Sequence, residues 1–182
     1  LAIDVATPSW VNPGIAAYNF ASGSISSLNT WYHIALVRSS GVITGYVNGT
    51  QYAVTSNIPG ETTNPVWIGF DNLGSFNGYI SNLRVVKGVA VYTGNFTVPT
   101  GPLSATQSSG SNISAITGSQ TSYLTCQSAM DIIDNSTLKL PIAYVGTPTA
   151  TFLNPFNSSY FPLLIAGTNA WTFATTGSQS IT

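Results

Sequence analysis

The sequence predicts an all-β protein that is built from antiparallel strands and contains few, short helices. Side chains alternate along residues 31–38, Asn48 and Gly49 separate two further strand-like runs, and no segment keeps an apolar period of 3.6 residues. Asn-Gly is the pair that best tolerates the two positive φ angles of a type I′ turn. We therefore expect a meander of three strands at residues 31–38, 42–47 and 50–55.

The first strand of this meander is apolar in both of its alternating sets of side chains. Trp31 and His33 face one way, and Tyr32 and Ile34 face the other. A strand that carries apolar residues in both sets is typically covered on both faces. We therefore expect residues 31–38 to be packed on both sides.

The remaining regular structure is expected in short pieces. Further strands are predicted at residues 1–5, 15–20, 66–70, 78–87, 123–127, 138–145, 149–153, 160–165 and 170–175. Residues 88–95 have room for one helical turn, and Pro99 and Pro102 predict an extended strap along the body at residues 96–103. Residues 104–122 are almost wholly small and polar, so we interpret them as a linker or a long loop.

Charge and hydrophobicity argue against two classes of partner. Only 5% of the residues are charged, and the four basic residues nearly balance the five acidic ones. A nucleic-acid binder needs clustered lysine and arginine to displace counterions from phosphates, so we expect no nucleic acid as a partner. No apolar run approaches the roughly 18 residues that span a bilayer, so we expect no membrane insertion. The many Ser, Thr, Asn and Gly residues are typical of a protein that is packed into an assembly or exposed outside a cell.

Three segments carry a resemblance to a known superfamily. They are residues 31–38 (WYHIALVR), 45–49 (GYVNG) and 76–85 (FNGYISNLRV). In this order and spacing they resemble the laminin-G-like module of the concanavalin A-like lectin/glucanase superfamily, over about residues 28–103. The resemblance implies a two-layer antiparallel jelly-roll sandwich.

The segments that follow resemble one particular group of proteins within this superfamily. Residues 86–92 (VKGVAVY) and 95–99 (NFTVP) are similar to the version found in structural proteins of tailed bacteriophages, and residues 124–128 and 134–137 are similar to the tail of such modules. The resemblance implies a virion structural protein: a capsid decoration, fibre or appendage module on the extracellular particle surface. Its partners would be other virion proteins and copies of itself, and its ligands host or environmental glycans. The alternative is an extracellular carbohydrate-binding or adhesion module of a cellular protein.

The chain is expected to divide into three parts. Residues 1–104 form the jelly-roll module, residues 105–122 the linker or loop, and residues 123–182 an additional β segment. Residues 170–178 vaguely resemble an opening strand of such a module, so the last part is a candidate start of a following module. The first residue is not Met, so either processing removed the start or the chain is a window from a longer polypeptide. The opening strands of a full module are not recognised, and we favour the window.

The superfamily includes glycosidases, so we considered catalysis. Retaining hydrolysis needs two carboxylates about 5 to 5.5 Å apart. The only glutamate, Glu61, lies in a Pro/Gly-rich loop, and Asp131 and Asp134 are spaced for a helical turn or a loop. His33 is the sole histidine and is expected to pack and hydrogen bond within the sheet, because no catalytic partner can be named. We therefore expect no enzymatic activity.

A candidate glycan rim lies around one predicted turn. Asp71, Asn72, Phe76 and Asn77 combine amide, carboxylate and aromatic groups there, and Trp67 is a further aromatic candidate. Trp67 also fits a core position, because residues 66–70 alternate as a buried strand does. Asp71 is a candidate Ca²⁺ ligand, but one carboxylate supplies little charge, and Asp-Asn is common in turns. We therefore expect no cofactor, with calcium at Asp71 as the alternative.

Overall fold

The structure is a computed structural model that describes residues 2–5, 25, 27, 29–55, 68–71, 74–128, 130–144, 146–156, 163–165, 171–173 and 179–181. All strand pairs in this part of the chain are antiparallel. The helical content of the same residues is a single 3-10 turn, η1 (Gly118–Gln120). The predicted all-β antiparallel fold with few helices is confirmed, and it is consistent with a jelly roll. No helix among the described residues has the length and apolarity to cross a bilayer.

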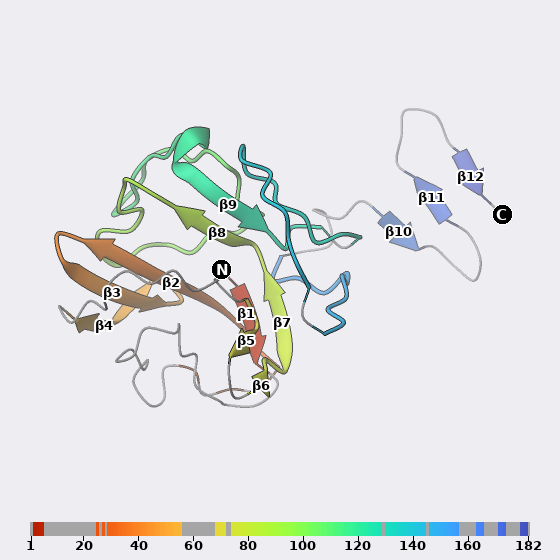
Figure 1. The fold of residues 1–182 in the computed structure, drawn as a ribbon, viewed down its shortest axis with the longest axis horizontal. Helices are drawn as coiled ribbons and strands as arrows, with labels where there is room; N and C mark the ends of the chain where they lie inside the picture. Colours follow the sequence, from red (N-terminus) through yellow and green to blue (C-terminus); the bar gives the residue numbers. More distant parts are fainter. Residues whose placement is uncertain are drawn as a thin grey trace.

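A five-stranded sheet forms the centre of the molecule, in the order β4-β3-β2-β1-β7 (Figure 1). Its strands are β1 (Ala2–Val5), β2 (Trp31–Ser39), β3 (Val42–Val47), β4 (Thr50–Thr55) and β7 (Gly78–Ser81). Two tight turns join β2 to β3 and β3 to β4. Positive φ angles occur at Ser40 and Gly41 in the first turn and at Asn48 and Gly49 in the second, as type I′ turns require. The predicted meander is confirmed.

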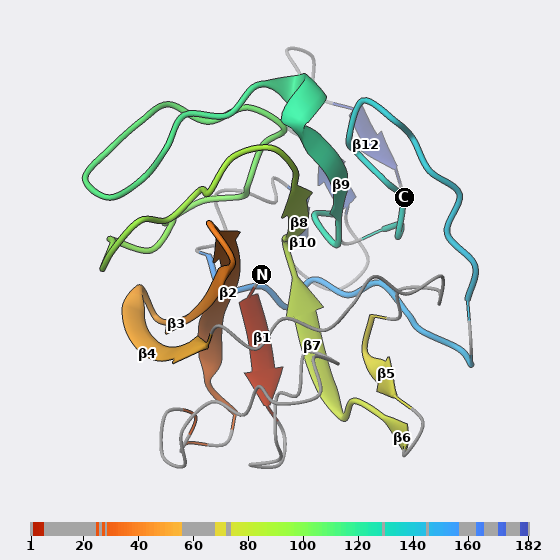
Figure 2. The same ribbon diagram turned by 60° about the vertical axis from the view of Figure 1, so that its left-hand side comes forward.

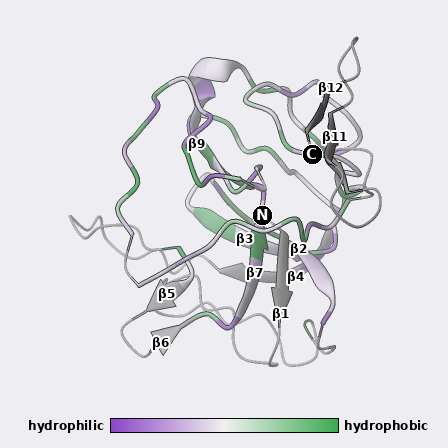
Figure 3. Ribbon diagram, turned by 90° about the vertical axis from the view of Figure 1, so that its right-hand side faces the viewer, coloured by the Kyte–Doolittle hydropathy of each residue, from purple (hydrophilic) through white to green (hydrophobic). Residues whose placement is uncertain are grey.

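Both faces of β2 are packed, as its sequence predicts. Tyr32 and Ile34 join Val47 in one buried cluster, to which the partly buried Ile25, Phe76 and Ile80 also belong. Val37 lies in a second cluster, whose other buried members are Tyr46, Val91, Tyr92, Phe96 and Ile116. Green, hydrophobic colour marks β3 and β7 within the body in Figure 3. The central sheet therefore separates two apolar layers.

The long strand predicted at residues 78–87 is wrong, because the chain changes sheets at Asn82. This residue adopts a left-handed backbone conformation with φ 55°, which Asn tolerates better than most residues. Before it, β7 pairs with β1 in the central sheet. After it, β8 (Leu83–Val86) pairs with β9 (Thr121–Thr125) in a separate two-stranded sheet.

The remaining strands are short. β5 (Phe70–Asp71) and β6 (Gly74–Ser75) form a small hairpin that lies beside one end of β7 in Figures 1 and 2. β10 (Leu163–Ile165), β11 (Trp171–Phe173) and β12 (Gln179–Ile181) form a three-stranded sheet that lies apart from the other sheets in Figure 1. The strand predicted at residues 15–20 and the first two residues of that at 66–70 lie outside the described residues. Of the remaining three, residues 68 and 69 form a bend, and only Phe70 belongs to a strand.

The strands predicted near residues 138–145 and 149–153 are wrong for the described residues there. These residues carry no strand or bridge assignment. Pro141 and Pro148 lack a backbone N–H donor, which works against pairing in a ladder. Apolar side chains on this stretch are exposed instead, among them Leu138 and Phe152.

The segment between β8 and β9 is a long irregular excursion rather than a helix and a linker. The helical turn predicted at residues 88–95 is wrong: Tyr92 forms an isolated bridge with Ile113, and Ser114 N donates to Val91 O. Gln107 forms a second bridge with Ile116, whose side chain is buried. Of the two interpretations of residues 104–122, these contacts favour the long loop. Because β9 pairs with β8, residues on both sides of that loop share one sheet; the division into three domains otherwise stays a prediction.

Candidate functional site

The strap, residues 96–103, crosses the body and is held at both ends. Phe96 N donates to Gly49 O at 2.9 Å, and Leu103 N donates to the Asn82 side-chain oxygen at 2.8 Å. Leu103 O accepts a further hydrogen bond from the Gln127 amide. The side chains of Phe96 and Leu103 are buried. These contacts connect the strap to the β3–β4 turn at one end and to the β7–β8 junction at the other.

Two pockets adjoin the strap. The first, which we name the aromatic pocket, has a volume of about 330 Å³. Its lining residues are Trp31, Tyr32, His33, Asn48, Asn82, Val98, Pro99, Thr100, Leu103, Pro155 and Phe156. The second, which we name the arginine pocket, has a volume of about 500 Å³ and is lined by Arg84, Pro99, Pro102, Leu103, Ser104, Thr106, Gln107 and Ser108. Pro99 and Leu103 belong to both linings, so the strap forms the wall between the two pockets.

His33 gives the aromatic pocket a neutral wall. Its ring meets the rings of Tyr92 and Phe96 edge-on, at centroid distances of 6.0 and 5.5 Å. Burial, together with nearby positive charge that includes Arg84, lowers the pKa of His33 to about 3. The imidazole is therefore uncharged at pH 7. The packing expected for His33 is confirmed, but neither ring nitrogen has a hydrogen-bond partner among the described residues.

Polar groups at the mouth of the aromatic pocket are available to a ligand. The Asn48 side-chain oxygen accepts a hydrogen bond from His33 N at 2.9 Å, which fixes the orientation of the amide. The Asn48 NH₂ group has no hydrogen bond to a described residue, and the side chain is exposed. Thr100 is exposed nearby, and Trp31 is half-buried with Tyr79 at a ring-centroid distance of 6.5 Å. The mouth therefore combines aromatic surface with amide and hydroxyl groups.

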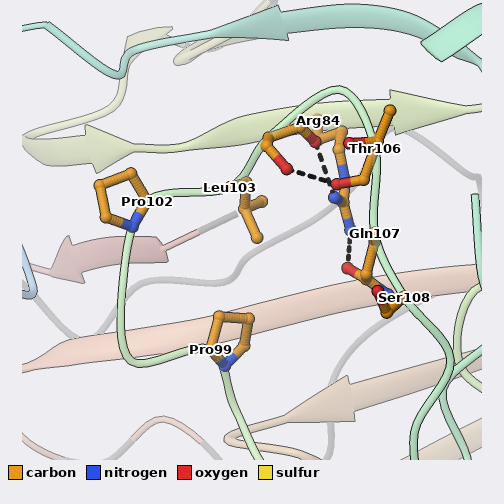
Figure 4. A pocket seen from close by; sticks show the side chains of 8 residues that line it. Arg84, Pro99, Pro102, Leu103, Thr106, Gln107 and Ser108 are labelled. Carbon is orange, nitrogen blue, oxygen red and sulfur yellow. Dashed lines mark hydrogen bonds between the residues drawn. The ribbon is translucent and has the colours of Figure 1, made fainter. Parts of the chain in front are cut away.

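Arg84 is the central residue of the arginine pocket. Its guanidinium donates to Ser104 O at 3.0 Å and to the Gln107 side-chain oxygen at 2.7 Å (Figure 4). It also interacts with the Tyr92 hydroxyl. All three partners are formally neutral, and none of the eight described residues that line the pocket is acidic. Burial lowers the pKa of Arg84, but a guanidinium stays protonated in proteins.

Only two residues of the predicted glycan rim, Phe76 and Asn77, have described side chains. Phe76 is partly buried and packs against the cluster of Tyr32, Ile34 and Val47. Asn77 is exposed, and neither Phe76 nor Asn77 lines either pocket. The backbone of Asp71 pairs with Gly74, whereas its side chain, together with Trp67 and Asn72, lies outside the described residues. The rim and its calcium ligand therefore stay predictions.

Sequence reasoning missed the residues that line the pockets. From the sequence, Trp31 and His33 are expected only to pack within the sheet, and Asn48 only to form a turn. Asn82 and Arg84 fall inside one continuous predicted strand. The available signal is the Asn at position 82, because an Asn inside an apolar strand pattern is a candidate for a left-handed break.

The carboxylate of Asp134 is an acceptor of hydrogen bonds within the fold. One side-chain oxygen accepts hydrogen bonds from Leu124 N at 3.0 Å and Ser136 N at 2.9 Å; the other accepts from Ser136 Oγ and Leu140 N, both at 2.8 Å. Burial alone would raise the pKa of Asp134, but these hydrogen bonds together hold it below its usual value. The other acid whose side chain is described, Asp131, is exposed. The described residues also contain no group of three or more His, Cys, Asp or Glu that could hold a metal ion.

Comparison with known proteins gives one match. Residues 5–91 match the family model of the concanavalin A-like lectin/glucanases superfamily, of the laminin-G type. The matched stretch contains the meander, the β7–β8 junction and Arg84. Searches of curated proteins and of solved structures give no match.

Proposed function

We propose that this chain, whose residues 5–91 belong to the concanavalin A-like lectin/glucanase superfamily, is a non-enzymatic glycan-binding module. The aromatic pocket is the observation that carries the proposal. Its volume of about 330 Å³ falls in the range of small-ligand sites. Such sites combine aromatic walls with a few oriented polar groups, as this pocket does.

The pocket chemistry suits a neutral sugar ring. The rings of Trp31 and Phe156, which line the pocket, offer apolar surface to the C–H groups of a pyranose. The Asn48 amide and the Thr100 hydroxyl can hydrogen bond to ring hydroxyls. Because His33 stays uncharged at pH 7, the pocket does not demand a charged ligand.

The lining of both pockets supports a binding role over hydrolysis. Among the described residues, no carboxylate lines either pocket, whereas most glycosidases place two carboxylates around the scissile bond. The proposal also calls for no calcium. We expect EDTA to leave both the melting temperature and glycan binding unchanged, whereas a loss of either would support the calcium alternative at Asp71.

We propose that the module serves on a virion surface as a decoration, fibre or appendage protein. The phage-like motifs at residues 86–92 and 95–99 support this role. A second support is the exposed apolar surface between residues 130 and 153, because such surface commonly marks protein contacts. Its residues are Met130, Ile133, Leu138, Leu140, Tyr144, Phe152 and Leu153. Copies of this chain or neighbouring virion proteins would cover it; a cellular adhesion module remains the alternative.

A glycan array probed with the purified chain tests the binding role. We expect at least one array glycan to bind, and both Trp31→Ala and Asn48→Ala to weaken that binding at least tenfold. Tyr52→Ala is the matched control, because Tyr52 is an exposed aromatic residue on β4 outside both pockets. Equal thermal stability of the folded variants makes the comparison valid. No binding, or equal loss in the control, would contradict the proposal, as would new reducing ends in a bound oligosaccharide.

Light scattering and particle microscopy test the assembly role. We expect the isolated chain to self-associate or to bind purified particles, and Leu138→Ser with Phe152→Ser to weaken either interaction. Density for this fold on a phage particle would support the virion role. Localisation of the chain to a cell surface would favour the adhesion alternative.

A further inference from the structure

We infer that the arginine pocket binds the carboxylate of an acidic sugar, so that the preferred ligand is a uronic acid-containing oligosaccharide. This inference rests on the proposed glycan-binding function. It concerns the second pocket, on the other side of the strap from the neutral sugar position.

The positive charge of Arg84 is not balanced by any of its described partners. Its side chain is partly buried, and its described partners are the formally neutral groups of Ser104, Gln107 and Tyr92. A cation that is withdrawn from water without a counter-charge is unfavourable. A ligand carboxylate would supply the missing charge through strong, charge-assisted hydrogen bonds.

The guanidinium of Arg84 is held in place and keeps N–H donors for a ligand. Arginine has five N–H donors in a planar fork, and the hydrogen bonds to Ser104 O and Gln107 each use one of them. With Tyr92 as a third neighbour, N–H donors remain for a ligand. The hydrogen bonds to Ser104 and Gln107 also hold the fork in place beside the pocket (Figure 4), so less side-chain entropy is lost when a carboxylate binds.

The arginine pocket has one apolar side and one polar side. Pro99, Pro102 and Leu103 provide an apolar wall, and Figure 4 shows the two prolines apart from the polar side that carries Arg84 and Gln107. Thr106 and Ser108 are exposed there and offer hydroxyl groups to a sugar ring. A site with one apolar and one polar side matches the amphipathic form of a uronic acid.

The arginine pocket and the aromatic pocket lie on the two sides of the strap. Pro99 and Leu103 line both of them, so a chain of linked sugars has only the strap to cross between the pockets. The neutral ring would occupy the aromatic pocket, and the acidic ring would occupy the arginine pocket. One oligosaccharide could therefore use both sites.

The test compares each acidic glycan with its own uncharged form. An array carries galacturonate and glucuronate trisaccharides, each beside its methyl ester, and calorimetry in 50 mM NaCl follows the best pair. We expect the intact protein to bind the acid at least tenfold more tightly than the ester. Arg84→Gln should remove this preference, so that the variant binds the acid and its ester with about equal affinity. Arg84→Lys, which keeps the charge but loses the planar fork, should keep part of the preference.

The outcomes separate this inference from the proposed function. Equal binding of acid and ester by the intact protein would overturn the inference while leaving glycan binding in place. An unchanged acid preference in folded Arg84→Gln would also overturn it. Absence of binding to every array glycan would overturn the proposed function itself. The comparison of acid with ester in the intact protein needs no variant, so it decides the matter even if Arg84→Gln does not fold.

Discussion

The meander and the strap are stabilised in different ways. In the meander, residues 31–55, successive strands pair through backbone ladders joined by two-residue turns, with one register shift in the β3–β4 ladder. The strap, residues 96–103, has no strand assignment and is held by the buried side chains of Phe96 and Leu103 and by single hydrogen bonds to Gly49, Asn82 and Gln127. A ladder distributes its stability over many bonds, whereas the strap concentrates it in a few contacts. Because the strap forms the wall of both pockets, those contacts determine the site.

The largest loss of stability is expected where the meander and the strap are in contact. A Cβ on Gly49 would lie 2.0 Å from Phe96 O, and φ at Gly49 is +77°. Gly49→Ala therefore combines backbone strain with a clash against the strap, and we expect a loss of about 3 kcal/mol in the free energy of unfolding. Chemical denaturation followed by tryptophan fluorescence measures it.

Gly41 provides the matched control for this prediction. It has φ +78° in the other turn of the meander, and a Cβ added there would meet no atom within 4 Å. Gly41→Ala should cost only the conformational strain, about 1 kcal/mol. Equal losses in the two alanine variants would show that the strap contact at Gly49 contributes nothing.

A somewhat smaller effect is expected at the other end of the strap. Asn82 is 2% exposed and accepts a hydrogen bond from Leu103 N. Asn82→Ala leaves this buried donor unpaired and puts alanine in a left-handed conformation, so we expect a loss of about 2 kcal/mol. Asn82→Gly tolerates the conformation but still lacks the acceptor, so it should recover part of the loss and still weaken glycan binding. Full recovery of binding in Asn82→Gly would contradict a positioning role for the side chain.

Asp134 extends the comparison to another irregular segment, after β9. Its carboxylate is 4% exposed and accepts four hydrogen bonds. Because the folded-state pKa is lowered, its stabilisation is present above the unfolded pKa and is lost as pH falls through the folded value. We expect Asp134→Asn to cost about 1.5 kcal/mol at pH 7. The difference between the two proteins should shrink in strong acid; a difference independent of pH would contradict this account.

The smallest effect at neutral pH is expected for the ionisation of His33. Its folded pKa of about 3 lies below the ordinary value of 6.5, so below pH 6.5 the unfolded chain binds a proton that the folded chain does not. Stability should therefore be complete above pH 6.5 and fall as pH decreases toward 3. His33→Gln should flatten this part of the stability profile in pH-dependent denaturation. An equally steep profile in the variant would assign the acid sensitivity to other groups.

The fold was predictable where local chemistry decides it. Asn48-Gly49 and the alternation in residues 31–38 depend on neighbouring residues, and both predictions are confirmed. The break at Asn82 has only one local signal, the Asn itself, because the contacts that fix it are with Leu103 and Cys126, which are distant in sequence. The long loop at residues 104–122 has a linker-like composition, and only its packing through Ile113 and Ile116 shows otherwise.

The site was less predictable than the fold for the same reason. Trp31, Asn48 and Arg84 come from three separate elements, and the strap brings them into two adjacent pockets. Each residue has an ordinary structural explanation in its own segment. The predicted rim at Asp71 and Asn77 relied on sequence neighbours instead, so it named residues of one turn.

The most direct test of the account is a crystal structure of the chain with its tightest-binding array oligosaccharide. We predict a sugar ring in the aromatic pocket, stacked against Trp31 and within hydrogen-bond distance of the Asn48 amide. A sugar bound at the Asp71–Asn77 turn, with the aromatic pocket empty, would contradict the assignment of the site.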